Sequence, residues 1–379
     1  MKSTLYTLIL SAALSTSLFS CSENNGNETG EPLSPTNVVN SETLNFSVDT
    51  LYSDLENPWG MVWLEDGRML VTERSGEILI FENDGYTGEQ VQGMPDVYAR
   101  GQGGLMDIQK KDDWLYIAYA KPTQGGGATT IMRARLDGNN LVDQEELIQT
   151  TPATDSGVHF GCRIVFDNED YLYFSSGERG TKPNAQDLTN SHGKIHRINL
   201  DGSIPDDNPF VNEPNAVKSI WTYGNRNPQG MIYDAENNRI WAHEHGPKGG
   251  DELNLIEKGK NYGWPLVTHG IDYDGSVISE ETEKEGVTPP VHYWDPSIAP
   301  CGMVQVTSDR YGAWKGNLLI GALAHQHVAR VELDGTEYAG EEKLLQDIGR
   351  VRHVAQSPDG YIYVVTEGTG LMVKLIPEE

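Results

Sequence analysis

The chain has 379 residues, in which 56 acidic side chains outnumber 28 basic ones and give a formal net charge of −28 at pH 7. Such an acidic surface repels other polyanions, which excludes nucleic acid and anionic lipid headgroups as binding partners. The 41 glycines, and 17 tyrosines against 7 phenylalanines, are typical of a turn-rich all-β protein.

The N-terminal segment predicts export. Lys2 precedes an apolar run of small residues from Leu5 to Phe19, and this run ends just before Cys21. The run is too short for a spanning helix and is typical of a secretory signal. We therefore assign residues 1–20 to a lipoprotein signal peptide and expect a lipid anchor at Cys21, which would be the only membrane contact. A simple secretory peptide with an incidental cysteine is the alternative. The anchored protein would lie on the periplasmic or outer-membrane face of the cell envelope.

The rest of the chain divides into a short tether and one large domain. Residues 21–42 are polar and rich in Asn and Gly, so they predict a flexible tether. Residues 43–379 show no internal linker, which favours one repetitive domain over two unrelated ones. One pattern recurs there: a turn rich in Asp, Asn and Gly, an apolar strand, a second turn and another alternating strand. Its six copies comprise residues 65–81, 113–136, 167–200, 237–256, 314–333 and 358–376.

Six such copies predict an all-β fold, a six-bladed β-propeller. No copy can bury both faces of its sheet alone, whereas radial stacking gives each sheet two apolar neighbours. Residues 45–51 alternate as a strand does and are expected to close the ring against the last blade. The inner strands of such a ring converge on an axial pocket, where residues that are distant in sequence meet.

Eight motifs along residues 55–375 carry a resemblance to a known family. The chain resembles the soluble pyrroloquinoline quinone (PQQ)-dependent aldose sugar dehydrogenases, which are related to soluble quinoprotein glucose dehydrogenase. The motifs follow the family's order and are Glu56–Gly60, Gly101–Leu105, His159–Arg163, Tyr223–Gly230, His243–Pro247, Asp251–Asn254, Asn261–Pro265 and Arg350–Arg352. The resemblance implies PQQ- and Ca²⁺-dependent oxidation of an aldose at C1 to the lactone. The electrons would pass to an external acceptor.

His159 is the expected catalytic base. It follows the polar loop 154–157 and is expected to open the strand 163–166, with its ring pointing into the axial pocket. A histidine with a near-neutral pKa can take a proton from a sugar hydroxyl. From the residues alone, a histidine that caps a backbone carbonyl is the simpler interpretation. The resemblance assigns the base of the reaction to this position.

Arg226 and Asn227 are predicted to contact the cofactor. Pro228 restricts the residue before it to extended geometry, and the turn is expected to present both side chains on one side. A planar guanidinium suits a quinone carbonyl or a carboxylate, although a salt bridge within an acidic propeller is the alternative. The resemblance implies that both residues bind PQQ and that Arg226 stabilises the oxyanion of the reduced quinone.

Further residues match cofactor contacts of the family. Gln102 lies among glycines that let the backbone approach a ligand closely. Arg350 and Arg352 are two apart on a predicted strand and therefore share one face, which the resemblance directs at the carboxylates of PQQ. Tyr273 also falls on a PQQ position.

The chain departs from the glucose-dehydrogenase branch at one cofactor position. Ala324 stands where that branch has a lysine that binds the cofactor. The neighbouring His325 and Gln326 are expected to substitute for this lysine, and the departure places the chain with the broader aldose dehydrogenases.

The region 243–262 is predicted to bind calcium. Residues 243–245 (His-Glu-His) suggest zinc, but no third ligand follows at a sensible spacing. The resemblance implies Ca²⁺, which prefers carboxylate and carbonyl oxygens. Gly246 and Pro247 would offer carbonyls to an ion that bridges PQQ, and Glu252 and the Tyr262 carbonyl match a structural site. The alternative is that Asp251 and Glu252 are only solvated turn carboxylates.

Two alternatives come from other functional classes. One is a calcium-dependent lactonase-type propeller hydrolase, for which the chain lacks a matching set of axial carboxylates. The other is a non-catalytic ligand-binding propeller, against which the presence of His159, Arg226 and Asn227 argues.

The two cysteines that remain after lipidation, Cys162 and Cys301, are expected near the same pocket mouth. An exported protein can form disulfides, and we hypothesise a bridge that pins the His159 loop to the fifth blade. Two buried free thiols that act as small apolar residues are the alternative.

Overall fold

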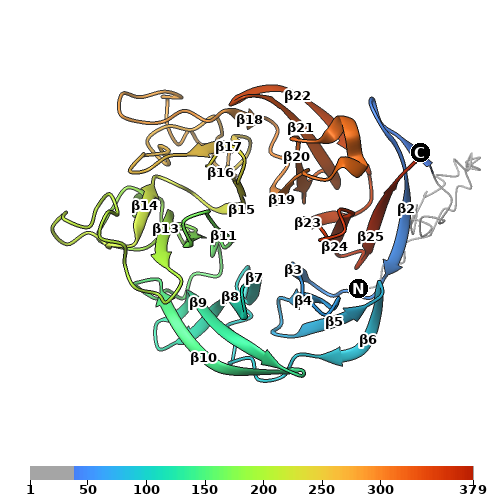
Figure 1. Ribbon diagram of the computed structural model, residues 1–379. Helices are drawn as coiled ribbons and strands as arrows, with labels where there is room; N and C mark the ends of the chain where they lie inside the picture. The colour runs from blue at the N-terminus through green and yellow to red at the C-terminus, as the bar shows by residue number, and fades with distance from the viewer. Residues whose placement is uncertain (1–37, 379) are drawn as a thin grey trace, which may run out of the picture. The chain divides into compact units, whose positions relative to one another are not determined.

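The computed structural model describes residues 38–378 and shows six sheets arranged in a ring (Figure 1). Blade 1 consists of β3 (Pro58–Trp63), β4 (Met69–Glu73), β5 (Ile78–Glu82) and β6 (Gly85–Gln90). Blade 2 consists of β7 (Leu105–Lys111), β8 (Trp114–Thr123), β9 (Gly126–Asp137) and β10 (Asn140–Gln149). Blade 3 consists of β11 (Ile164–Phe166), β12 (Tyr171–Ser176), β13 (Lys194–Asn199) and β14 (Ile220–Tyr223).

The second half of the ring repeats this order. Blade 4 consists of β15 (Pro228–Asp234), β16 (Arg239–Glu244), β17 (Asp251–Ile256) and β18 (His292–Trp294). Blade 5 consists of β19 (Pro300–Gln305), β20 (Leu318–Ala322), β21 (His327–Asp334) and β22 (Glu337–Leu344). Blade 6 consists of β23 (Arg350–Gln356), β24 (Ile362–Glu367), β25 (Met372–Pro377), β2 (Asn45–Tyr52) and β1 (Val38–Asn40). Two short 3₁₀ helices, η1 (Lys182–Ala185) and η2 (Asp309–Trp314), lie in the connections. The six-bladed propeller is confirmed.

The six sequence repeats correspond to the second and third strands of each blade, counted from the axis. In blade 1, for example, β4 pairs antiparallel with β5 from Met69 opposite Phe81 to Thr72 opposite Ile78. Every residue of β4 is buried, because neighbouring blades cover both faces of the sheet. The repeats were visible for this reason: strands that are buried on both faces carry uniformly apolar sequences.

The ring closes as predicted, through β2. This strand pairs antiparallel with β25, from Phe46 opposite Pro377 to Tyr52 opposite Met372, and the two lie side by side in Figure 1. Phe46 and Val48 alternate into the core beside blade 6. The N-terminal and C-terminal strands therefore belong to one sheet.

The sheet begins earlier than the sequence predicted. β1 pairs with β2 and adds a fifth strand to blade 6, although residues 38–40 were assigned to the tether 21–42. Val39 packs against the blade-6 core, so this stretch has an apolar side chain to bury after all. The predicted signal peptide, Cys21 and the rest of the tether lie outside the described residues. Within residues 38–378, no helix combines the length and hydropathy needed to span a bilayer.

Candidate active site

The axial channel is divided by one buried side chain, Arg163. Its guanidinium contacts a group from each of the other five blades. These contacts are to the Trp59 carbonyl (3.1 Å), Asp107 Oδ1 (3.3 Å), the Gln229 carbonyl (3.0 Å), Cys301 Sγ (3.9 Å) and the Arg352 carbonyl (3.2 Å). Cavities lie at both ends of the inner strands, and residues on both sides bond to this guanidinium.

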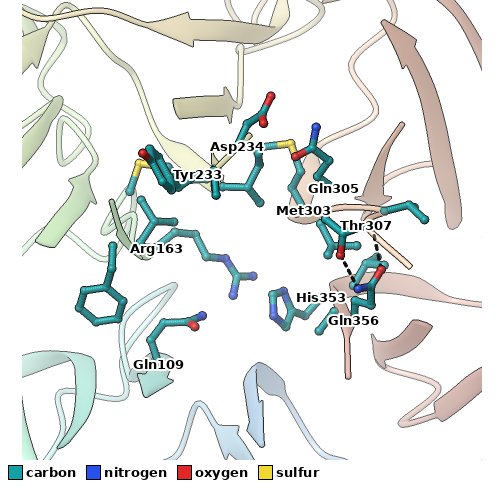
Figure 2. Close-up of a pocket in the computed structure, with 18 of the residues that line it drawn as sticks. Gln109, Arg163, Tyr233, Asp234, Met303, Gln305, Thr307, His353 and Gln356 are labelled. Carbon is teal, nitrogen blue, oxygen red and sulfur yellow. Dashed lines mark hydrogen bonds between the residues drawn. The ribbon is translucent and has the colours of Figure 1, made fainter. Parts of the chain in front are cut away.

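The larger cavity, of about 890 Å³, lies toward the carboxyl ends of the inner strands (Figure 2). Most of its polar groups already bond to protein partners. The Gln356 amide bonds with Thr307, and Asp234 accepts hydrogen bonds from Asn237 and Arg239. None of the predicted site residues lines this cavity, so its size does not make it the active site.

The smaller cavity, of about 300 Å³, lies toward the amino ends of the inner strands and collects predicted site residues. Its lining includes Gln102, Asn227, Arg350 and Arg352, together with Trp59, Arg74, Gly101, Gly161, Gln229, His245, Ala299, Leu323 and Glu367. An adjoining hollow shares Ala299 with it and is lined by Pro247, Tyr273 and Ala324. The propeller therefore brings together residues from all six blades, as the axial geometry predicted.

His159 lies beside this cavity with a carboxylate on one ring nitrogen. Its Nδ1 is hydrogen-bonded to Glu178 Oε1, and its backbone N–H donates to Gln102 Oε1 at 2.7 Å. Burial holds the pKa of His159 below its usual 6.5, against the opposing effect of Glu178, and the nearby Arg226 lowers the pKa further. A neutral imidazole that donates from Nδ1 to Glu178 keeps Nε2 free as a proton acceptor.

The backbone at His159 differs from the expectation. The strand β11 begins at Ile164, and His159 precedes it in a left-handed conformation with φ of 54°. The loop backbone and the contact with Glu178 therefore orient the ring, whereas the sequence predicted that the start of a strand would do so. Left-handed backbone is uncommon for a residue other than glycine and is often found at functional sites.

Arg226 and Asn227 are anchored by a buried carboxylate that sequence reasoning did not single out. Glu244 accepts hydrogen bonds from the backbone N–H groups of both residues and from the Asn225 side chain at 2.8 Å. Arg226 Nη1 donates to the carbonyls of His245 and Gly246, at 3.0 and 2.8 Å. The Asn227 side chain turns toward Gly161 instead, whose N–H donates to its Oδ1 at 3.2 Å. The two side chains thus have separate partners around one site.

A guanidinium cluster forms the blade-6 side of the smaller cavity. Arg352 Nε donates to Glu367 Oε2 at 2.9 Å, and Arg350 Nε lies 3.6 Å from Glu367 Oε1. The positive charge of Arg352, followed by that of Arg350 and Arg74, holds the pKa of Glu367 below its usual value despite burial. Arg350 and Arg352 share one face, as their spacing predicted.

Of the three remaining residues predicted to bind the cofactor, Tyr273 lies at the edge of the site, and His325 and Gln326 lie away from it. Tyr273 is 70% exposed and its ring lies 6.0 Å from the Arg226 guanidinium, at the site's edge. His325 and Gln326 lie in an exposed turn between β20 and β21 and line neither the smaller cavity nor its adjoining hollow. Contact between these two residues and a cofactor therefore stays a prediction with no support from their positions.

The acidic residues on β16 and β17 are buried and are not solvated turn carboxylates. Glu244 and Glu252 lie in opposite positions on β16 and β17, and both are less than 10% exposed. Burial raises the pKa of both carboxyl groups above their usual value, and the neighbouring Glu244 raises that of Glu252 further. The neighbouring Asn254 Oδ1 is buried without a hydrogen-bond partner. Two close carboxylates and an unsatisfied amide oxygen suit a hard cation.

Side-chain ligands alone do not complete a metal site there. Within residues 38–378, no three His, Cys, Asp or Glu side chains converge as metal ligands. Carbonyl oxygens such as those predicted at Gly246, Pro247 and Tyr262 would have to supply the remaining ligands. The two histidines beside Glu244 have other partners, since Nε2 of His243 bonds to the Gly302 carbonyl and Nε2 of His245 to that of Pro300.

Calcium is expected to stabilise the folded protein. Binding at a hundredfold excess over Kd contributes about 2.7 kcal/mol, so millimolar Ca²⁺ should raise Tm in a thermal melt. Glu252→Gln should abolish this rise without destabilising the metal-free protein, because it removes one of two buried like charges. Glu257→Gln is the control, because Glu257 is an exposed acid just past the other end of the same strand. Equal Tm values with calcium and with chelator in the wild type would contradict the site.

The hypothesis of a Cys162–Cys301 disulfide is wrong, because both thiols are free and buried. Alternation explains the error: Cys162 packs with Phe160 and Phe174 between blades, whereas the adjacent Arg163 points to the axis. Cys301 lies near the axis and contacts Arg163 and Arg352. Alkylation of the denatured, non-reduced protein should therefore label both thiols. A mass spectrum in which neither Cys162 nor Cys301 carries the label would contradict the conclusion that the thiols are free.

Comparison with known proteins identifies the family. A family model described as glucose/sorbosone dehydrogenase matches residues 55–374. The chain belongs to this family. It is 40% identical over 344 residues to the aldose sugar dehydrogenase YliI of Escherichia coli, covering 87% of this chain and 93% of that protein. The predicted family and oxidoreductase class are confirmed.

Solved structures of family members agree with the fold. The apo-form of the soluble E. coli aldose sugar dehydrogenase has a TM-score of 0.85 at 38% identity, covering 88% of this chain and all of that one. A PQQ-bound aldose sugar dehydrogenase from Streptomyces coelicolor has a TM-score of 0.73 at 27% identity, covering 88% and 98%.

Proposed function

We propose that this protein is a PQQ- and Ca²⁺-dependent dehydrogenase that oxidises aldose sugars at the C1 hydroxyl to the lactone and passes the electrons to an external acceptor. The observation that carries the proposal is the His159–Glu178 pair beside both Arg226 and a guanidinium-lined cavity. The names of the family relatives support a sugar substrate, and the PQQ-bound S. coelicolor relative supports the cofactor.

The smaller cavity fits an anionic cofactor. Arg350 and Arg352 face the single carboxylate of Glu367, and Asn227 and Gln102 add side-chain amides to the lining. PQQ is a tricarboxylic quinone, and guanidinium groups match carboxylates with paired hydrogen bonds. These four residues would hold it, with Arg226 at its edge. When bound, it would supply the two-electron acceptor for the hydride that leaves C1.

The calcium part of the proposal rests on oxygen ligands. The Gly246 and Pro247 carbonyls would hold an ion beside the cofactor, and Glu252 with the Tyr262 carbonyl would hold a second, structural ion. The buried Glu244–Glu252 pair and the unsatisfied Asn254 Oδ1 support the structural ion. The Gly246 carbonyl accepts one hydrogen bond from Arg226, and its second lone pair would be available to the ion beside the cofactor. A divalent ion would neutralise charge that is otherwise unfavourable to bury.

The chain's own residues would perform the proton transfer. Nε2 of His159 would accept the proton of the C1 hydroxyl as the hydride departs. Glu178 at Nδ1 would keep the imidazole in the required tautomer and stabilise the imidazolium. The Arg226 guanidinium, fixed by two carbonyls, would stabilise negative charge that develops beside it, because an oriented donor in a poorly solvated site needs no reorganisation.

The location of the protein is part of the proposal. A lipid anchor at Cys21 and a tether would hold the propeller on the periplasmic or outer-membrane face, where it would meet aldoses and an acceptor from the envelope. The N-terminal sequence supports this placement.

A dye-linked assay tests the proposed reaction. The purified apoprotein should not reduce dye with any aldose, and PQQ together with Ca²⁺ should restore sugar-dependent reduction. Absence of activity over a panel of aldoses, with PQQ shown to be bound, would overturn the proposal. Hydrolysis of lactones without dye reduction would favour the hydrolase alternative.

A further inference from the structure

The smaller cavity has a third guanidinium, from Arg74, on the side of blade 1. Arg74 follows β4 directly and lines the cavity together with Arg350 and Arg352 of blade 6. No sequence motif pointed to it. In a chain with a net charge of −28, three guanidiniums around a cavity of about 300 Å³ indicate an anionic occupant.

The backbone around Arg74 fixes where its side chain lies. Its N–H donates to the Asn57 carbonyl at 3.0 Å, and its carbonyl accepts from the Leu105 N–H at 2.9 Å. The guanidinium Nη1 donates to the Gly101 carbonyl in the loop that carries Gln102. A Cβ on Gly104 would lie 2.1 Å from the Arg74 carbonyl oxygen and 2.5 Å from its Cγ, so only glycine permits this approach. Arg74 is therefore held between the first two blades.

The charges of the cluster do not balance within the protein. Glu367 is the acidic residue in the cavity lining, against three arginines. It is paired with Arg352 and lies 3.6 Å from Arg350, and all three arginines act on its carboxylate. The cluster thus keeps an excess of two positive charges, which a ligand with several carboxylates would neutralise.

A gap in the cofactor contacts lies on the side of blade 5. Ala324 lines the adjoining hollow and supplies no charge, and the exposed His325 and Gln326 line neither space. The resemblance to the glucose-dehydrogenase branch implies a lysine at the position of Ala324. Arg350 bonds to the Leu323 carbonyl at 3.2 Å, so it already reaches toward this side. Another residue of the cavity lining therefore has to supply the missing positive charge.

We propose that Arg74 is a carboxylate-binding residue of the cofactor site, and that the Arg74–Arg350–Arg352 cluster supplies the three positive groups for a tricarboxylic quinone in a chain that has Ala324 in place of a lysine. This assignment rests on the proposed function. Arg74 makes up for the missing charge from blade 1, which borders blade 6 on the side away from Ala324.

Cofactor affinity is the direct readout, because it does not depend on turnover. Apoprotein is titrated with PQQ, and Kd is read from quenching of tryptophan fluorescence. Arg74→Gln should raise Kd by about 10- to 100-fold, the effect of losing a hydrogen bond between charged groups. Arg74→Lys should raise it less, since the charge remains. Arg68→Gln is the matched control: Arg68 belongs to the same blade, pairs with Asp66, and does not line the cavity.

Two further arms make the test decisive. Ala324→Lys should lower Kd more in the Arg74→Gln background than in the wild type, because the lysine would replace the charge that Arg74 supplies, whereas a merely structural role for Arg74 predicts equal effects in the two backgrounds. Thermal melts verify folding, and if Arg74→Gln fails to fold, Arg74→Lys carries the comparison. A wild-type Kd in folded Arg74 variants would overturn this inference and leave the proposed function standing. Failure of the wild type to bind PQQ would overturn both.

Discussion

Replacing His159 by alanine is expected to lower kcat by about 10²- to 10⁴-fold, the usual contribution of a positioned general base. The affinity for PQQ should stay unchanged, because His159 is not among the residues that line the smaller cavity. Steady-state kinetics with a dye acceptor, together with PQQ titration of the same protein, separate the two effects. A variant that keeps kcat within about tenfold of the wild type would contradict the assignment of the base.

The pH profile tests the same assignment independently. A base acts when deprotonated, so kcat/KM falls as the pH drops through its pKa. Burial holds the pKa of His159 below 6.5, and the acid limb of the wild type should therefore lie below pH 6.5. Glu178→Gln removes the partner that raises this pKa, so the limb should move to lower pH while kcat falls. An acid limb that Glu178→Gln leaves in place would contradict the pairing.

Replacing Arg226 by glutamine is expected to reduce kcat by about 10²- to 10³-fold, as loss of one preoriented donor does in other enzymes. Nη1 of Arg226 donates to the carbonyls of His245 and Gly246. The other N–H groups of the guanidinium are therefore available to the site. Lysine cannot reproduce this geometry, so Arg226→Lys should recover little. Because Arg226 lowers the pKa of His159, its removal should move the acid limb to higher pH.

The matched control for Arg226 is Arg239→Gln. Arg239 lies in the same blade, is paired with Asp234 at 2.8 Å, and lines neither the smaller cavity nor the adjoining hollow. Its loss should leave kcat unchanged. A melt of each variant shows whether the fold is retained. Full activity in a folded Arg226→Gln protein would contradict a role for this guanidinium in the reaction.

The fold could be predicted because its signal is periodic. Each blade repeats two strands that are buried on both faces, so apolar runs recur at blade spacing, and the closing strand around Phe46 alternates as a half-buried strand does. Turn residues such as Asp66 and Gly67 separate the runs. The strand β1 was missed because it is three residues long, too short to show alternation.

The site was only partly predictable, since the motifs name residues and their partners lie on other strands and loops. His159 was found, but Glu178 lies 19 positions away on the next loop, with no motif to link them. Glu244 was noticed only as a neighbour of two histidines, although it anchors the Arg226 turn. The pairing of β11 with β12, and of β15 with β16, brings these partners together, and no local sequence pattern records that pairing. Sequence adjacency was similarly misleading at Cys162, whose neighbour Arg163 reaches the axis while the thiol does not.

The most direct test of the central claim is the absorption spectrum of the protein loaded with PQQ and Ca²⁺ under anaerobic conditions, recorded before and after one addition of an aldose. For the wild type, we expect the quinone spectrum to convert to that of the quinol within the time needed to mix the samples. His159→Ala should give the same starting spectrum and convert far more slowly. A bound quinone whose spectrum stays unchanged with every aldose would contradict the account.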